Sequence, residues 1–428
     1  MRSSWFRAGI PALLAVVLVA GSVFGGLASS TNQSSSFFKE IPYNKSAIEA
    51  DDFLKEFKTV IIDPMAFKKA ADSGVVSLEL FGRGLKILLT PVKVQSENAV
   101  IIIENESGKF IEEAPPLYTY RGKVEGIKNS RVIFTVSGDV VVGMIELGDE
   151  YFVVDQTNKK YNGRVVHIIY SSEMVRDKTN ATAIPLNDDV ISHINLKTVD
   201  LMVENTLTET LSTTTVDLLA GYDTEFKNAF SNPTAEIASM IASVNDAYAP
   251  AGVQLSIKSY RYYSNIPNGD CGNVLGNFFD RASSDRDSTK SDLAFLFSGK
   301  NFNGQVVGCS YGYCGGSAWC GFATAQMVSE PGTSYTASFK DRCILIAHET
   351  GHNFDAGHQD NTDPNYARAY HWKYIIWDRY TALWTPFMGT GWIGGMQLEF
   401  SDRNNHGDST HDNIRRISET KTTIAGYR

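Results

Sequence analysis

The residues best suited to chemistry lie in one run, HETGHNFDAGH, at positions 348–358. If this run begins on a helix, His348 and His352 project from one face and can reach a single metal ion. Glu349 then lies at the flank of that face, where its carboxylate can contact a metal-bound water. This spacing is typical of metal-assisted hydrolysis with the glutamate as general base. The alternative is a surface helix whose histidines only form hydrogen bonds. Chance produces three histidines and a glutamate at these offsets in roughly one of several thousand chains.

The third histidine of the run, His358, requires the helix to end before it. On a continuing helix, at about 100° per residue, His358 would point about 240° away from His352. The segment Asp355-Ala356-Gly357 predicts a turn, because aspartate and glycine tolerate left-handed backbone. The apolar residues Ile344–Ala347 lead into the run, and they predict a helix buried beneath the site.

The run resembles the signature of the metzincin metalloproteases, H-E-x-x-H-x-x-G-x-x-H followed by a methionine turn. Asp355 stands where that family has a glycine, and aspartate enters the left-handed region at modest cost. The segment Thr385–Gly389 is the candidate methionine turn, and Met388 would form the apolar floor beneath the metal. The alternative for Met388 is an ordinary core methionine. Thr390 replaces the tyrosine of astacin-like and serralysin-like enzymes, which favours the adamalysin/reprolysin branch.

The resemblance implies one catalytic Zn²⁺, held by His348, His352 and His358, with water in the remaining position. Zinc lowers the pKa of such a water toward ~7, and Glu349 would take its proton and pass it to the leaving nitrogen. A distant glutamate as third ligand, as in thermolysin-like enzymes, is the alternative that His358 argues against. The sequence leaves a structural Ca²⁺ undecided.

The same resemblance implies a substrate cleft beside an antiparallel edge strand near Val306–Tyr311. Val306, Val307 and Gly308 would pair with an extended peptide, main chain to main chain. Trp392, in the loop after the methionine turn, would line an apolar pocket, or else belong to the core.

The elements expected around this run are those of a mixed α+β and α/β fold. Residues 211–428 resemble a metzincin catalytic domain: a twisted, mostly parallel sheet with an antiparallel edge strand, an active-site helix and the methionine turn. Apolar patterns predict strands at Val216–Tyr222, Val253–Tyr262 and Asp292–Phe297, and a helix at Ala235–Ala249.

Residues 29–210 read as a β-rich domain and a linker. Alternating runs predict strands at Leu85–Thr90, Ala99–Glu104, Arg131–Val136, Val140–Ile145 and Tyr151–Asp155, with a hairpin turn at Ser137-Gly138-Asp139. The run from Tyr118 to Gly126, continuing through Ser130, Gly143 and Tyr151, resembles the reprolysin propeptide. An unrelated β domain used for binding is the alternative. Thr206–Thr215 is expected to link the two parts.

Composition places the chain among ordinary globular proteins, with 428 residues, 43 % hydrophobic and 20 % charged. A net charge of −9 argues against a nucleic-acid partner and against a polybasic membrane patch. Residues 1–28 have the pattern of a signal peptide, so a secreted protein is expected. The alternative is a protein anchored by an uncleaved N-terminal segment.

All five cysteines fall in one stretch, at Cys271, Cys309, Cys314, Cys320 and Cys343. In an exported chain this clustering predicts two disulfides and one spare thiol, with the connectivity open. A second metal site is the alternative use of these residues.

Together these features predict a secreted zinc metalloendopeptidase of the EC 3.4.24 type, acting as a monomer on protein or peptide substrates. A zinc-binding but catalytically weak adhesion or recognition module is the alternative, motivated by Asp355. The N-terminal half is a candidate inhibitor of its own catalytic half, and the alternative is a folding aid or a permanent binding domain with no inhibitory role. Residues 29–205 contain no cysteine that could bind the zinc, so inhibition would be steric, across the edge strand or the cleft.

Overall fold

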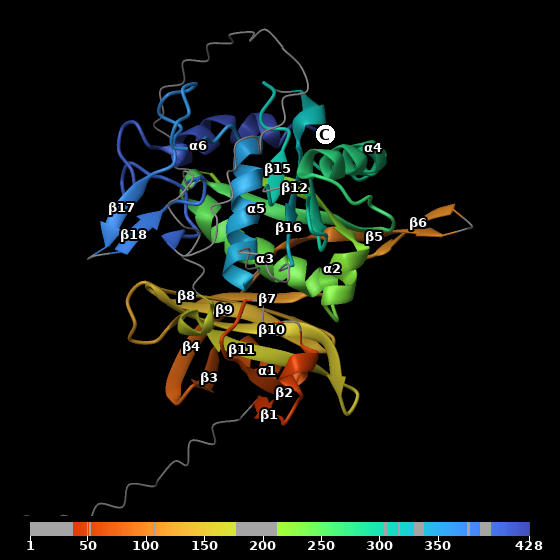
Figure 1. The fold of residues 1–428 in the computed structure, drawn as a ribbon, viewed down its shortest axis with the longest axis vertical. Helices are drawn as coiled ribbons and strands as arrows, with labels where there is room; N and C mark the ends of the chain where they lie inside the picture. The colour runs from red at the N-terminus through yellow and green to blue at the C-terminus, as the bar shows by residue number, and fades with distance from the viewer. Residues whose placement is uncertain are drawn as a thin grey trace, which may run out of the picture. The chain divides into compact units, whose positions relative to one another are not determined.

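Two large β-sheets carry most of the regular structure in the computed structural model (Figure 1). The structure describes residues 37–48, 50, 53–105, 108–176, 212–303, 306–315, 317–328, 338–374, 377–385 and 395–428. The predicted signal peptide at 1–28, most of the predicted linker, Met388 and Trp392 lie outside the described residues. No helix among the described residues is long and apolar enough to cross a membrane.

The first sheet has nine strands, all paired antiparallel, in the order β1-β2-β11-β10-β9-β8-β7-β4-β3. Its strands are β1 (Phe38–Glu40), β2 (Lys58–Ile62), β3 (Val75–Leu80), β4 (Arg83–Val92), β7 (Tyr118–Val124), β8 (Ser130–Ser137), β9 (Val140–Leu147), β10 (Glu150–Tyr161) and β11 (Arg164–Ser171). The predicted hairpin turn is confirmed, because Ser137 pairs with Val140 and Gly138 has a φ of +50°.

The second sheet has seven strands in the order β15-β16-β14-β12-β13-β5-β6, parallel from β16 to β5 and antiparallel at both ends. Its strands are β5 (Gln95–Asn105), β6 (Gly108–Glu113), β12 (Thr214–Asp223), β13 (Val253–Tyr263), β14 (Leu293–Ser298), β15 (Gly308–Ser310) and β16 (Phe322–Gln326). The three strands predicted for this region are confirmed. The first starts earlier than expected, so Thr214 and Thr215 belong to a strand and not to the linker. A two-stranded sheet pairs β17 (His371–Tyr374) with β18 (Trp377–Tyr380).

The helices are α1 (Pro64–Asp72), α2 (Thr224–Ala229), α3 (Pro233–Tyr248), α4 (Cys271–Thr289), α5 (Phe339–Asn353) and α6 (Asn413–Ile424), with short 3₁₀ turns at Lys45–Ala47, Ser172–Met174, Ala249–Ala251 and Ala318–Cys320. The predicted helix at Ala235–Ala249 is confirmed as α3. Asn232 caps α3 by accepting the N–H of Ala235, and Pro233 supplies a pre-set φ at the first helical position.

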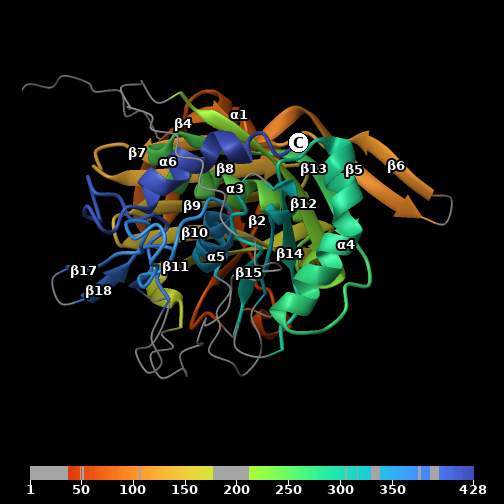
Figure 2. The ribbon, with the colours of Figure 1, turned by 90° about the horizontal axis from the view of Figure 1, so that it is seen from above.

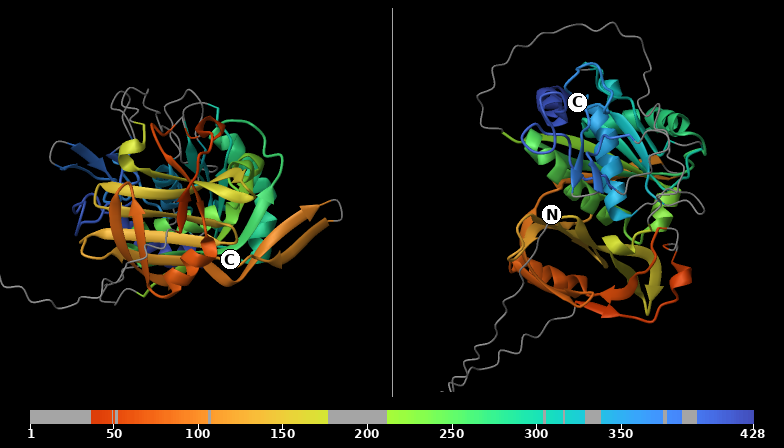
Figure 3. Two further views of the ribbon diagram at one scale, coloured as in Figure 1. Left: turned by 90° about the horizontal axis from the view of Figure 1, so that it is seen from below. Right: turned by 60° about the vertical axis from the view of Figure 1, so that its left-hand side comes forward.

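Helix α3 is hydrogen-bonded to both sheets and lies beside α5 (Figure 3). Ser239 donates its hydroxyl to the Val142 carbonyl of β9, and Asn245 donates its amide to the Leu255 carbonyl of β13. The main apolar core joins α3, α5 and the inner faces of both sheets. Helix α5, which carries the candidate site, is therefore packed against α3 and the main core. Such packing provides the rigid support that a functional site needs.

The N-terminal half also adds strands to the second sheet, which the sequence did not indicate. Strand β5 pairs in parallel with β13, with Val100 opposite Ser259 and Ile102 opposite Arg261. The two halves thus share one sheet, whereas the division near residue 210 predicted a separate N-terminal domain.

Candidate functional site

Helix α5 carries the first two histidines and is held at both ends by polar contacts. Ser338 caps it, since its hydroxyl accepts the Asp341 N–H and donates to the Asp341 carboxylate. The Phe339 N–H donates to the Tyr170 hydroxyl of β11 at 2.9 Å. At the other end, the Asn353 amide reaches the carbonyls of Cys320 and Phe322, at 3.3 and 3.4 Å. Every residue of α5 is buried, as the apolar run Ile344–Ala347 predicted.

The structure brings His348, His352 and His358 together in one cluster. One ring nitrogen from each side chain lies within 4.8 Å of the others. The Nε2 atoms of His348 and His358 are 3.2 Å apart, and the three ring centroids are separated by 4.6–5.2 Å. His348 and His352 are buried, whereas His358 is half-buried.

Backbone carbonyls orient two of these rings. His348 Nδ1 lies 2.8 Å from the Ala382 carbonyl oxygen, and His352 Nδ1 lies 2.9 Å from the Ala356 carbonyl oxygen. Because a carbonyl only accepts, each Nδ1 carries the proton and each Nε2 offers its lone pair, the form in which imidazole binds metals. Asp360 and Asp363, which follow the third histidine, are exposed and lie in turns.

The turn between His352 and His358 closes α5 with paired hydrogen bonds. The Ala356 N–H donates to the Gly351 carbonyl and the Asp355 N–H to the His352 carbonyl, which is a Schellman arrangement. Asp355 takes the left-handed position, with a φ of +65°. Its carboxylate accepts the Nε and Nη2 of Arg416 from α6, at 2.8 and 2.5 Å. The aspartate therefore adopts glycine's conformation and adds an ion pair.

Gly357 does not share the left-handed position, although the sequence made it a candidate. It is needed for close approach, because a Cβ there would lie 2.5 Å from the Asn361 side chain. Asn413, at the start of α6, accepts the Gly357 N–H and donates to the Gly357 carbonyl, at 3.0 and 3.1 Å. Helix α6 thus supports the turn that carries His358 at two points.

Glu349 is 1 % exposed and faces strand β15. A Cβ added to Gly308 would lie 2.3 Å from Glu349 Oε1, so the carboxylate lies directly against the Gly308 backbone. Gly308 was predicted to line a cleft, and the structure gives it this close approach. Val307 is 6 % exposed and its carbonyl accepts the Gln326 N–H, while Val306 is half-buried.

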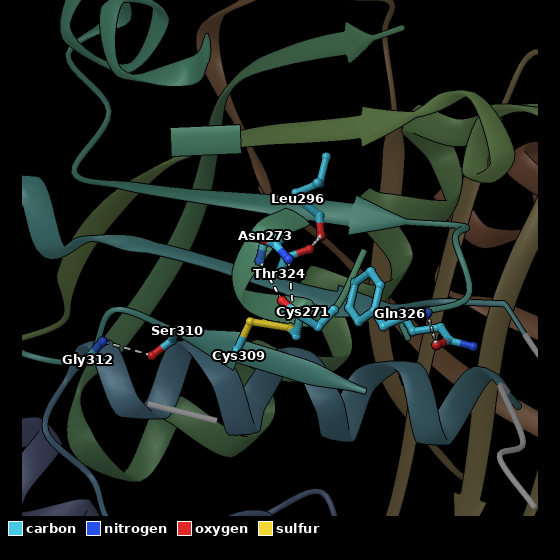
Figure 4. Close-up of a disulfide and its surroundings, with 10 residues drawn as sticks. Cys271, Asn273, Leu296, Cys309, Ser310, Gly312, Thr324 and Gln326 are labelled. Atoms are coloured by element: carbon cyan, nitrogen blue, oxygen red, sulfur yellow. Dashed lines mark hydrogen bonds between the residues drawn. A yellow bond between two sulfur atoms is a disulfide. The ribbon is translucent and has the colours of Figure 1, made fainter. Parts of the chain in front are cut away.

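Both predicted disulfides are present, and one fixes strand β15. Cys271, the first residue of α4, is bonded to Cys309 at the centre of β15 (Figure 4). Ser310 accepts the Gly312 N–H at 3.0 Å beside it. Cys314 is bonded to Cys320, and Cys343 is the spare thiol, buried within α5. Burial raises the pKa of the Cys343 thiol well above its usual value. Among the described residues, none of the five cysteines belongs to a cluster that could hold a metal ion.

The first residue of the segment predicted to carry the methionine turn, Thr385, is held by hydrogen bonds to its backbone. The Gln359 side chain donates to the Thr385 carbonyl and accepts the Thr385 N–H, at 2.9 and 3.0 Å. Met388 and Trp392 lie outside the described residues. Met396, which follows them, is 7 % exposed and belongs to the main core. Sequence reasoning missed Gln359, Asn413 and Arg416, since their partners lie 26 to 61 residues away.

The three histidines fit a zinc ion by the nature of their donor atoms, and the pair His348 and His358 also fits by its spacing. Imidazoles on one tetrahedral Zn²⁺, with Zn–N bonds of 2.0–2.1 Å, place their nitrogens about 3.3 Å apart. The 3.2 Å between the Nε2 atoms of His348 and His358 matches this requirement. Neutral imidazoles that donate their other N–H to carbonyls are also the usual form of such ligands.

Comparison with known proteins gives one family match. Residues 212–380 match the model Reprolysin_5, metallo-peptidase family M12. No curated protein matches the chain. Among solved structures, metalloproteinase-II from Bacteroides fragilis is 14 % identical, with 67 % of this chain and 82 % of that chain covered and a TM-score of 0.37. A chain from the structure of a chaperone–substrate complex is 16 % identical, with a TM-score of 0.37. That match covers 51 % of this chain and only 35 % of the other. Both TM-scores are below 0.5, so the family match alone bears on function.

Proposed function

We propose that this chain, whose residues 212–380 match the reprolysin-like model of metallo-peptidase family M12, is a secreted zinc-dependent endopeptidase. The observation that carries the proposal is the cluster of His348, His352 and His358, together with the buried carboxylate of Glu349, which follows His348 on α5 and lies against Gly308. The geometry resembles a metzincin site in its helix, its turn and its third histidine.

In this proposal the three histidines hold one Zn²⁺, which when bound supplies Lewis-acid chemistry that acidifies water and polarises a carbonyl. Glu349 accepts the proton of the attacking water and delivers it to the leaving nitrogen. Gly308 leaves room for the Glu349 carboxylate, and the carbonyls of Ala382 and Ala356 keep two imidazoles in the metal-binding tautomer.

Strand β15 is the best-placed element to hold a substrate. It is the last strand of its sheet, and among the described residues its strand partner is β16. An extended peptide can add to such an edge through main-chain hydrogen bonds. The residue next to Gly308 on that peptide would then lie near Glu349. The Cys271–Cys309 disulfide keeps the edge in place.

The N-terminal half is proposed to act as an inhibitor that works by covering the site. In the described residues its hairpin β5–β6 pairs at the opposite edge of the sheet from β15. Any segment that covers β15 must therefore come from elsewhere in that half. The full chain should then hydrolyse substrate more slowly than the same chain cleaved in its predicted linker, even after thiol alkylation.

The proposed activity is tested by metal analysis and a cleavage assay. Both are done on the purified full chain and on its processed form, which is the chain cleaved in the predicted linker between its two halves. One zinc per chain is expected, with hydrolysis of an unfolded protein substrate that a chelator stops and added zinc restores. Zinc binding without turnover in the processed form would instead support the weak recognition module. Absence of zinc binding would refute both.

A further inference from the structure

The hairpin of β5 and β6 exposes an unusual amount of apolar surface. Of the six large hydrophobic side chains that are exposed in the described part of the chain, three lie on this hairpin: Ile103 at 36 %, Phe110 at 43 % and Ile111 at 60 %. All six residues of β6 are exposed. Figure 2 shows the hairpin extending past α4. Strand β6 ends the sheet, and within the described residues its ladder partner is β5 alone.

An edge strand with open backbone groups and apolar side chains is a template for another strand. The sequence of β6 is Gly-Lys-Phe-Ile-Glu-Glu, in which Lys109, Ile111 and Glu113 share one face and Phe110 and Glu112 the other. The charges at positions 109 and 113 are opposite in sign and lie at equal distances from Ile111. A strand with this symmetry is complementary to a second, antiparallel copy of itself.

We propose that two copies of the chain associate through antiparallel pairing of their β6 strands about a two-fold axis at Ile111. An axis perpendicular to the sheet keeps each side chain on its own face of the sheet. Each residue therefore lies opposite a residue whose side chain is on the same face. Ile111 then lies opposite Ile111 of the second copy. Lys109 lies opposite Glu113 on one side, and Glu113 lies opposite Lys109 on the other. Such cross-strand pairs stabilise a sheet.

Other registers lack this complementarity. An axis at Phe110 places Lys109 opposite Ile111, and an axis at Lys109 places two lysines opposite each other. Lys109 also bonds Asp285 of α4, with Nζ 2.7 Å from Oδ1. Because an ammonium has three donors, it can bond the Glu113 of the second copy as well.

The predicted dimer is weak. A ladder of six residues per copy buries less surface than a standard stable interface, so we expect dissociation in roughly the micromolar range. The sequence led us to expect a monomer, whereas this proposal predicts a concentration-dependent dimer. The proposal does not depend on the peptidase activity.

Sedimentation velocity of the full chain over roughly 1–100 µM tests the association. The wild type should shift from monomer to dimer as the concentration rises. In Glu113→Lys, Lys109 of each copy would lie opposite a lysine of the other copy, so the association should weaken at least tenfold. Glu79→Lys is the matched control, an exposed glutamate on β3, the edge strand of the other sheet. It should dimerise like the wild type.

Cross-linking tests the register independently. Facing residues of antiparallel strands have Cα atoms about 4.5–5.5 Å apart, within reach of a disulfide. Ile111→Cys should therefore form a reducible covalent dimer under mild oxidation, and Glu112→Cys, which would face Phe110, should not. A wild type that stays monomeric throughout would overturn the proposal. So would a dimer that Glu113→Lys leaves intact and that the Ile111→Cys substitution does not cross-link.

Discussion

At the scale of single residues, the geometry of the site depends on the backbone at two positions as much as on its histidines. Asp355 occupies the left-handed position that ends α5, and Gly308 leaves the space that the Glu349 carboxylate fills. The sequence predicted the turn at Asp355, because the spacing of the histidines forces the helix to stop. It could not show that Arg416 pairs with Asp355, since nothing local links residues 61 apart.

Substitution of Asp355 tests the turn. Asp355→Gly should relieve the positive φ but lose the pair with Arg416, so zinc affinity and hydrolysis should stay within about threefold of wild type. Asp355→Val should reduce zinc affinity by tenfold or more, because a β-branched residue tolerates positive φ badly. Competition with a zinc chelator measures both, and equal affinity in the valine variant would contradict this account of the turn.

Substitution of Gly308 tests the placement of Glu349. In Gly308→Ala the new methyl would collide with the carboxylate, so we expect hydrolysis to fall at least tenfold while zinc content is unchanged. Gly276→Ala on α4 is the control, because its nearest neighbour would be 3.9 Å away and alanine favours a helix. Equal activity in the two variants would show that the carboxylate has room to move.

At the scale of elements, strands and helices with strong periodicity were predicted well. The strands β12, β13 and β14 and the helix α3 match their predicted ranges to within a few residues. Helix α4 was not predicted, because its apolar residues Val274, Leu275, Phe278 and Ala282 are diluted by serine, aspartate and glycine. The pairing of β5 with β13 was also missed, since parallel partners far apart in sequence leave no local signal.

Strand β11 contains a titratable group whose effect on stability can be measured. His167 is fully buried, accepts the Val141 N–H at 3.3 Å and bonds the Val165 carbonyl at 3.2 Å. Burial lowers the pKa of His167 from 6.5 to about 3. As the pH falls below 6.5, the unfolded chain binds a proton that the folded chain does not, so this group destabilises the fold on acidification.

We therefore expect the stability of the wild type, relative to His167→Gln, to drop by about 2 kcal/mol between pH 6.5 and 5. Glutamine can form the same hydrogen bonds but does not titrate. Urea unfolding of both proteins at the two pH values measures this difference. Parallel losses of stability in the two proteins would contradict the prediction.

At the scale of the whole molecule, a buried ion cluster joins the N-terminal sheet to the helix that carries the site. Arg342 of α5 bonds Asp155 of β10 at 2.7 Å and Glu236 of α3 at 3.0 Å, and Gln156 donates to Glu236 at 3.0 Å. All three charged side chains are at most 4 % exposed. Burial and the nearby Asp155 charge raise the pKa of Glu236.

Removal of the arginine should weaken both halves together. Arg342→Met leaves two buried carboxylates without their cation, which should cost about 3–5 kcal/mol of unfolding free energy. Lys86→Met, which removes one partner of an exposed pair with Glu125, should cost under about 1 kcal/mol. Thermal unfolding followed by aromatic fluorescence and by loss of metal binding should give coincident transitions. Separate transitions would show that the halves unfold independently.

The central claim is a division of labour in which three histidines hold zinc and Glu349 moves the proton. The most direct test is Glu349→Gln, measured for zinc content and for hydrolysis of the same substrate as the wild type. We predict one zinc per chain in both proteins, and hydrolysis in the variant reduced by about 10²–10⁴-fold or more. Comparable hydrolysis by the glutamine variant with its zinc in place would contradict the account.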